Sequence, residues 1–207
     1  MYHKLVSRSI RHYDVNIIIK VLILSDFIIW SANQLLAPIF AVFVIDKIDG
    51  SIEVIGIASA IYLITKSICE IPVGTFVDKA KDEKYDLYTA LAGTVLTASV
   101  YFMYMYITSV WQLYVLQSFM GLGAALAYPG WYSIFTRHID KGKEAYEWSL
   151  YDVLLGVGMA ATAALGGFLA DKFGFSTLFF IIGSFTLLGA MFLLLIKGKV
   201  HRKQRKT

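Results

Sequence analysis

The sequence has one cysteine, few charged residues and no histidine inside its long apolar segments. A single cysteine, Cys69, excludes a disulfide framework and a cysteine-based metal site. The histidines all lie outside the apolar segments, which excludes a Ser–His protease site or a His-ligated metal there; they are His3, His12, His138 and His201. No phosphate-binding Gly-x-x-x-x-Gly-Lys-Ser/Thr loop and no Thr-Val-Gly-Tyr-Gly ion filter occurs. We therefore expect neither an enzyme nor a bound cofactor or metal.

Apolar segments make up most of the 207 residues. The chain is 57% hydrophobic and only 16% charged, with a mean hydropathy of +0.63, whereas soluble domains are usually about 45–50% apolar and roughly 25% charged. A bilayer core takes about 20 apolar residues per helix, and six such runs fit here. They are too long for barrel strands, and only helices and closed barrels satisfy their backbone hydrogen bonds in lipid. The sequence predicts an all-α membrane protein with six transmembrane helices.

The basic residues are concentrated in alternate links between these runs. We expect an N-terminal segment over residues 1–16, a six-helix bundle over 17–196 and a basic tail over 197–207; the spans are 17–44, 52–77, 87–107, 110–135, 145–170 and 175–196. Nearly all Lys and Arg fall in the N-terminal segment, the second and fourth links and the tail, and such loops stay in the cytoplasm. Both termini are thus predicted to be cytoplasmic, in a multi-pass protein of the plasma membrane. Because the basic residues follow the membrane topology, the net charge of +4 does not indicate that the protein binds nucleic acid.

Four ionisable residues fall inside the predicted spans: Asp26, Lys66, Glu70 and Asp152. A charge near the bilayer centre costs at least ~2.5–3.5 kcal/mol, so such residues usually face a bundle interior or a watery cavity. With a helical rise of about 1.5 Å, all four are expected at similar depths, roughly 10–16 Å from the cytoplasmic ends. Lys66 and Glu70 are four residues apart and can pair, which is a structural explanation as good as a transport role. Asp26 and Asp152 have no basic neighbour on their own helices, which suits reversible protonation.

Polar and small residues extend this set of candidates. Asn33 and Gln34 in the first span either line the same cavity or bond between helices; with the four ionisable residues they are the candidate substrate- and proton-binding residues. Small residues in the fourth and fifth spans are predicted to let helices approach closely; they are Gly121, Gly123, Gly156, Gly166 and Gly167.

Aromatic residues gather near the ends of the third and fourth spans. We interpret them as interfacial belts, in which amphipathic rings lie at the level of the lipid headgroups. One belt surrounds the turn at residues 108–109 and the other lies near the opposite face; the members are Tyr101, Tyr104, Tyr106, Trp111 and Tyr114, and then Tyr128, Trp131 and Tyr132.

Three motifs together resemble those of the major facilitator superfamily. Gly74-x-x-x-Asp78-Lys79 follows the second span, Gly121-Leu-Gly-Ala-Ala-Leu lies in the fourth, and Gly166-Gly167-Phe-Leu-Ala-Asp171-Lys-Phe-Gly ends the fifth. The resemblance implies an N-terminal six-helix half, or a half-length member, of a fold with two such halves. It also implies that Gly74, Asp78 and Lys79 form a conformational latch against the other half.

The function that the resemblance implies is secondary active transport. Two six-helix bundles would rock around a central site and carry a small solute by alternating access, driven by protons. The second bundle would be another copy, a separate chain or another part of a longer chain. The alternative from another class is a non-transporting membrane scaffold or partner subunit derived from a transporter half. The sequence does not decide the substrate, the direction of transport or the coupling ion.

Overall fold

A computed structural model describes residues 15–200 of the chain. Residues 1–14 and 201–207, which hold most of the predicted N-terminal segment and basic tail, lie outside the described residues. The described range is all-helical and contains no strand, as predicted. Its elements are α2 (Ile17–Gln34), the 3₁₀ turn η1 (Ala37–Ile39), α3 (Phe40–Ile48), α4 (Ile52–Lys79), α5 (Glu83–Tyr104), α6 (Val110–His138) and α7 (Glu144–Leu194).

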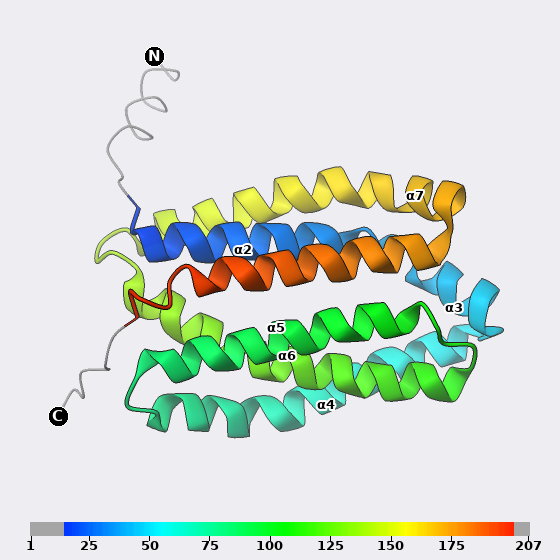
Figure 1. Ribbon diagram of the computed structural model, residues 1–207, viewed down its shortest axis with the longest axis horizontal. Coiled ribbons are helices and arrows are strands. Elements are labelled where there is room, and N and C mark those ends of the chain that lie inside the picture. The colour runs from blue at the N-terminus through cyan, green and yellow to red at the C-terminus, as the bar shows by residue number, and fades with distance from the viewer. Residues whose placement is uncertain (1–14, 201–207) are drawn as a thin grey trace, which may run out of the picture.

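Five helical segments are long and apolar enough to cross a membrane: Ile17–Ile48, α4, α5, α6 and α7. They make the chain an integral membrane protein. The fifth and sixth predicted spans form one 51-residue element, α7, which contains a single residue with non-helical backbone, Gly174. Its φ of 79° and ψ of 163° suit glycine, which has no Cβ. The chain reverses there, so that the two arms of α7 run antiparallel (Figure 1).

Short polar motifs set where the helices begin and break. The side chain of Asn16 accepts a hydrogen bond from the amide of Ile18 at 2.9 Å at the start of α2. Asp82 accepts from the amide of Lys84 at 2.9 Å at the start of α5. Such side chains satisfy amides that have no partner within the helix. Pro38 lies in η1 and separates α2 from α3, because proline lacks the amide hydrogen that a continuous helix requires.

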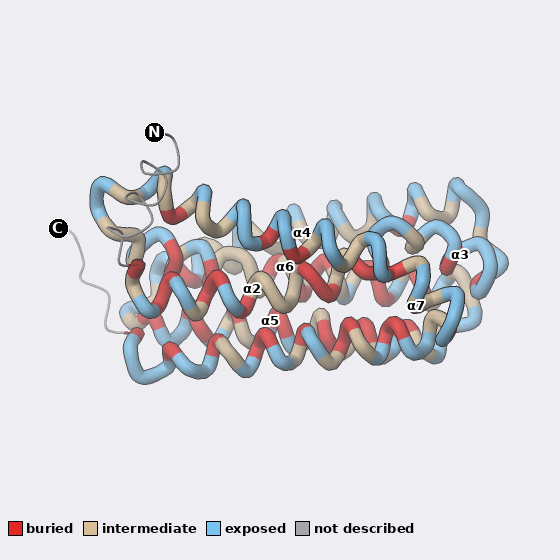
Figure 2. Tube along the Cα trace, turned by 90° about the horizontal axis from the view of Figure 1, so that it is seen from above, coloured by how far each residue is buried: buried red, intermediate tan, exposed pale blue. Residues whose placement is uncertain are grey.

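The longer helices form two layers (Figure 1). In one layer α2 packs against α7, and Figure 1 shows it between the two arms; in the other, α6 packs against both α4 and α5. Contacts between α5 and α7 join the layers. Buried residues lie along the inward sides of the helices (Figure 2). Helix α4 is the least covered, with only Ala58 and Val77 buried.

Two apolar clusters occupy opposite ends of the bundle. One contains the described chain ends, Val15 and Val200, together with residues at the start of α5 and the end of α6. The other contains residues of α3, the end of α5, the start of α6 and the start of the second arm of α7. The two described ends, Val15 and Val200, and the links 80–82 and 139–143 therefore share one end of the bundle, as the distribution of Lys and Arg predicts.

Candidate functional site

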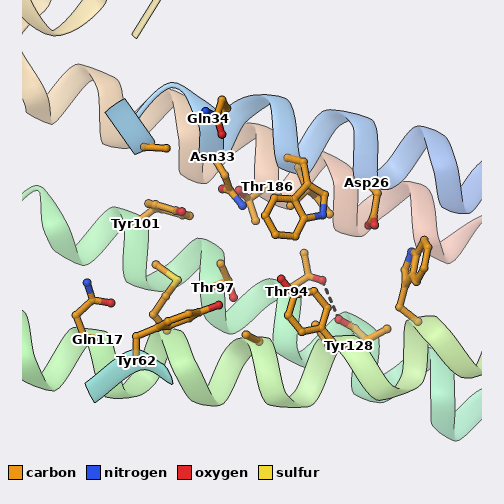
Figure 3. A pocket seen from close by; sticks show the side chains of 18 of the residues that line it. Asp26, Asn33, Gln34, Tyr62, Thr94, Thr97, Tyr101, Gln117, Tyr128 and Thr186 are labelled. Atoms are coloured by element: carbon orange, nitrogen blue, oxygen red, sulfur yellow. Dashed lines mark hydrogen bonds between the residues drawn. The ribbon is translucent and has the colours of Figure 1, made fainter. Parts of the chain in front are cut away.

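A cavity of about 490 Å³ lies between the two layers of helices (Figure 3). Helices α2, α4, α5, α6 and α7 all contribute to its wall. Its lining includes members of both apolar clusters, so it lies between the packed ends of the bundle. Figure 3 shows polar and aromatic side chains converging on it: Asp26, Asn33, Tyr62, Thr94, Thr97, Tyr101, Gln117, Tyr128 and Thr186.

One stripe of α2 forms the upper wall of the cavity in Figure 3. Asp26, Trp30 and Asn33 all line the cavity, and their spacing of three to four residues places them on one side of the helix. The adjoining Gln34 also lines it. Three of the six candidate binding residues predicted from the sequence, Asp26, Asn33 and Gln34, thus meet at one wall.

Asp26 is the one ionisable carboxylate among the described lining residues, and no Lys, Arg or His lines the cavity with it. It is partly buried. Its Oδ2 atom accepts a hydrogen bond from the hydroxyl of Tyr151 on the first arm of α7, at 2.9 Å. This bond joins α2 to α7 through the acidic group of the cavity wall.

Two lining residues hold buried polar atoms that make no hydrogen bond within residues 15–200. They are Oδ1 of Asn33, an acceptor, and Nε1 of Trp131, a donor. Most buried polar groups in proteins have a partner, so unpaired groups at a cavity point to a water or ligand that completes them. The cavity therefore has the volume and the unpaired polar groups of a small-molecule site.

Comparison with known proteins assigns the family. The family model described as Major Facilitator Superfamily matches residues 22–207. The chain belongs to the Major Facilitator Superfamily. A search of curated proteins finds no match. The superfamily is of transporter type, which agrees with a bundle whose helices surround a cavity.

The Lys66–Glu70 pair lies next to the wall of this superfamily member's cavity. The ammonium of Lys66 is 3.8 Å from Oε2 of Glu70 on the following turn of α4, as their spacing predicts. Neither residue lines the cavity. The Lys66 ammonium also lies 4.3 Å from the centre of the Tyr128 ring, which is a lining residue. Trp30 stacks on that ring with a centroid distance of 6.3 Å.

Asp152 lies away from the other candidates. It was expected to be buried at the shared cavity, but it is exposed and does not line the cavity. Its neighbour Tyr151 is the residue that contacts Asp26. Successive residues of an α-helix point about 100° apart, so when Tyr151 faces α2, Asp152 must face elsewhere.

The latch motif lies at the C-terminal end of α4. A Cβ added to Gly74 would make an ordinary contact, 3.9 Å from Cβ of Pro129 on α6, so the approach of these helices does not require glycine there. Asp78 and Lys79 are exposed. In the described part of the chain neither forms a salt bridge, and their role as a latch stays a prediction.

The predicted packing glycines fall into two groups. A Cβ at Gly121 would be 2.5 Å from the carbonyl oxygen of Tyr62 on α4, and one at Gly123 would be 2.6 Å from the Thr97 hydroxyl on α5. Gly166 similarly lies against the backbone of Leu35, directly after the end of α2. Gly156 and Gly167, by contrast, have no neighbouring atom within 4 Å of an added Cβ. The structure thus contradicts close packing at these two positions within the chain, because they face away from α2.

Several aromatic residues assigned to interfacial belts lie inside the bundle instead. Tyr101 and Tyr104 are buried, and they line the cavity together with Tyr128 and Trp131. Tyr106 and Trp111 are exposed at 78% and 65%, as a belt requires. The sequence does contain a signal that could have identified Tyr101 and Tyr104 as cavity residues. It is the helical spacing along α5 of Thr94, Thr97, Tyr101 and Tyr104.

A charge network at the basic end of the bundle was not predicted. Asp86, which is fully buried on α5, accepts hydrogen bonds from Arg137 at 3.0 Å and from Ser133 at 2.7 Å on α6. Glu83 lies 3.8 Å from the same Arg137 nitrogen. Asp86 falls in the link between the predicted spans 52–77 and 87–107, and only the packing of α5 on α6 shows that it is buried.

Proposed function

We propose that this member of the Major Facilitator Superfamily is a secondary active transporter that moves a small solute through the central cavity by alternating access, driven by protons. The observation that carries the proposal is the 490 Å³ cavity between the helix layers, with Asp26 as its one carboxylate. Sites for small molecules typically have volumes of about 300–1,000 Å³, with a few polar groups in a largely apolar wall. The cavity meets this description.

Proton coupling is supported by the contact between Asp26 and Tyr151. When Asp26 is charged, the Tyr151 hydroxyl donates to a carboxylate, and such charge-assisted bonds are roughly twice as strong as neutral ones. Protonation of Asp26 would weaken this bond between α2 and the first arm of α7. If two arrangements of these helices bind a proton with different affinity, protonation of Asp26 would thereby shift the equilibrium between them.

A second six-helix bundle is supported by the exposed surface of α4. Glu70 and Lys66 have side chains exposed by 35% and 26%, on a helix that contributes only two buried residues. Charges that face lipid are disfavoured by at least ~2.5–3.5 kcal/mol each on insertion scales, although pairing reduces this. We infer that another bundle, which is a second copy, a separate chain or another part of a longer chain, covers this side and completes the cavity. Asp78 and Lys79 would then act as the latch.

Six membrane crossings and cytoplasmic termini follow from the same proposal. The two arms of α7 are antiparallel about Gly174, so each would cross the membrane once. The end of the bundle that carries the chain ends and basic links would face the cytoplasm, in agreement with the positive-inside rule. The plasma membrane is the proposed location.

The test is uptake into proteoliposomes under a proton gradient that is imposed inward in one series and outward in another. The solutes are a radiolabelled panel of sugars, amino acids, organic cations and organic anions. We expect at least one solute to be taken up faster with one of these gradients, and Asp26→Asn to remove this stimulation. Asp171→Asn, which neutralises an exposed carboxylate on the same bundle outside the cavity, is the matched control.

Each result decides between the functions considered. Stimulated uptake that persists in Asp26→Asn would contradict the proton-coupling role of this residue. If no solute of the panel enters with or without a gradient, the transport proposal fails in favour of the scaffold.

A further inference from the structure

We propose that the cavity selects an amphipathic organic cation, namely a protonated amine attached to an aromatic or apolar body. This substrate class rests on the proposed transport function and makes it more specific. It follows from three properties of the wall: the sign of its charge, its aromatic faces and its hydrogen-bonding groups.

The charge of the cavity wall is negative. Asp26 is the one acidic lining residue in the described part of the chain, and no basic residue lines the cavity. The nearest charges behind the wall are Lys66 and Glu70, which pair with each other at 3.8 Å and largely cancel. A ligand cation would compensate Asp26, whereas an anion would be repelled by it. A neutral ligand would leave this carboxylate without a counter-charge.

Aromatic faces surround the space next to this carboxylate. Trp30 lies one helical turn from Asp26, on the same side of α2, and stacks on Tyr128. The faces of Trp and Tyr attract cations within about 6 Å. The wall already contains one such contact, since the Lys66 ammonium is 4.3 Å from the centre of the Tyr128 ring. The same kind of ring lines the cavity at Tyr62 and Tyr101.

Hydrogen-bond acceptors complete the match to an N–H donor. Thr94 and Thr186 donate their hydroxyl protons to carbonyls of their own helices, both at 2.8 Å, and so leave oxygen lone pairs for the cavity. Oδ1 of Asn33 has no partner within residues 15–200. A protonated amine can donate up to three hydrogen bonds to such oxygens. The unpaired Nε1 of Trp131 would serve a hydroxyl, ether or carbonyl on the body of the ligand.

The experiment uses three ligands with one body and three charges: 4-phenylbutylamine, 4-phenylbutanol and 4-phenylbutanoate at pH 7. Binding to the purified full chain is measured by isothermal titration calorimetry in a neutral maltoside detergent. Without lipid, no headgroup ammonium competes and no anionic surface concentrates the amine. We expect the amine to bind at least about tenfold more tightly than the alcohol, which corresponds to about 1.4 kcal/mol. The acid should bind more weakly than either.

Variants separate the contribution of the wall from general adsorption. Asp26→Asn should reduce the affinity for the amine about tenfold and change that for the alcohol by less than twofold, while Asp171→Asn should change neither. Trp30→Leu, which removes a ring without changing charge, should lower amine affinity by about three- to tenfold. It also provides a second test if Asp26→Asn does not fold.

The outcomes distinguish this inference from transport itself. Equal binding of amine and alcohol, or amine binding that Asp26→Asn and Trp30→Leu both leave unchanged, would overturn the cation proposal. Proton-stimulated uptake of a neutral or anionic solute, without amine binding, would leave transport standing and refute the substrate class. Asp26-dependent amine binding would support the site even if neither the amine nor any solute of the panel entered proteoliposomes, a result that would refute transport.

Discussion

Gly166 and Gly167 are neighbours on the first arm of α7 and provide a matched test of how this arm packs on α2. A Cβ at Gly166 would overlap the backbone carbonyl of Leu35, whereas a Cβ at Gly167 would have no atom within 4 Å. A backbone carbonyl cannot move aside as freely as a side chain can. We therefore expect Gly166→Ala to separate the helices, with an overpacking cost of about 1–3 kcal/mol.

The comparison of the two alanine variants isolates this overpacking. Replacing glycine by alanine inside a helix stabilises it by roughly 0.5–1 kcal/mol. This gain applies to both variants and cancels in their difference. A change of 1 kcal/mol shifts the Tm of a chain of this size by about 2–4 °C. Gly166→Ala should then unfold roughly 2–12 °C below Gly167→Ala.

The assay is thermal unfolding in maltoside, followed by tryptophan fluorescence and by the loss of the monodisperse peak in size-exclusion chromatography. Gly158 and Gly156 form a second pair on the same arm. Gly158 faces the side chains of Ser31 and Phe27, which can adjust, so Gly158→Ala should be less destabilising than Gly166→Ala. Gly156→Ala, into open space, should resemble Gly167→Ala. Equal Tm values for the Gly166 and Gly167 variants would refute this packing of α2 on α7.

Two further predictions concern the charge network and the orientation of the bundle. Arg137→Met removes the guanidinium that lies 3.0 Å from the fully buried Asp86. We expect the free energy of unfolding to fall by about 1–3 kcal/mol, which is less than for a fully buried ion pair because Arg137 is itself 35% exposed to solvent. Lys84→Met breaks the exposed pair between Lys84 and Asp82, 3.9 Å apart, and should lower the free energy of unfolding by less than about 1 kcal/mol in the same assay. Equal destabilisation by the two substitutions would argue against the buried network. In a Cys69→Ser background on intact cells, an impermeant maleimide should label Thr108→Cys and not Lys141→Cys; the reverse pattern would contradict cytoplasmic termini.

The helical content and the positions of most helices were predictable, because long apolar runs and polar links leave lipid-spanning segments few alternatives. The turn predicted at residues 171–174 contains the one break in α7, since only glycine suits the φ of 79° at Gly174. The contribution of α2 to the cavity was also within reach, because Asp26 and Asn33 are two helical turns apart and so share one side of the helix.

Which side each helix turns toward its neighbours was harder to predict. Composition marks both Asp26 and Asp152 as carboxylates in apolar helices, yet one lines the cavity and the other is exposed. The same holds for Tyr101 and Tyr106, which are alike in sequence context but are buried and exposed, respectively. The rotation of a helix about its axis depends on the residues of the helices that it contacts. A single sequence shows that polar or small residues recur along one side of a helix, but it does not show which neighbouring helix that side contacts.

The exposed side of α4 leads to a last prediction, about a second copy of the chain. Ile68 and Ile71 on this helix are 68% and 76% exposed, beside the partly exposed Lys66–Glu70 pair. A lipid-facing helix tolerates isoleucine and disfavours the charged pair, so protein is the better cover for this side. If that cover is a second copy, a twofold axis brings the same surface of both copies together.

We expect native mass spectrometry in mild detergent to give twice the 23.2 kDa of the chain. In a Cys69→Ser background, Ser67→Cys on the exposed side of α4 should cross-link to itself with a short bifunctional maleimide. Val95→Cys, exposed on α5, is the control and should not. A monomer that forms no cross-link at Ser67→Cys would refute the homodimer. Because the charged pair would still need a protein cover, that result would assign the second bundle to a different polypeptide segment.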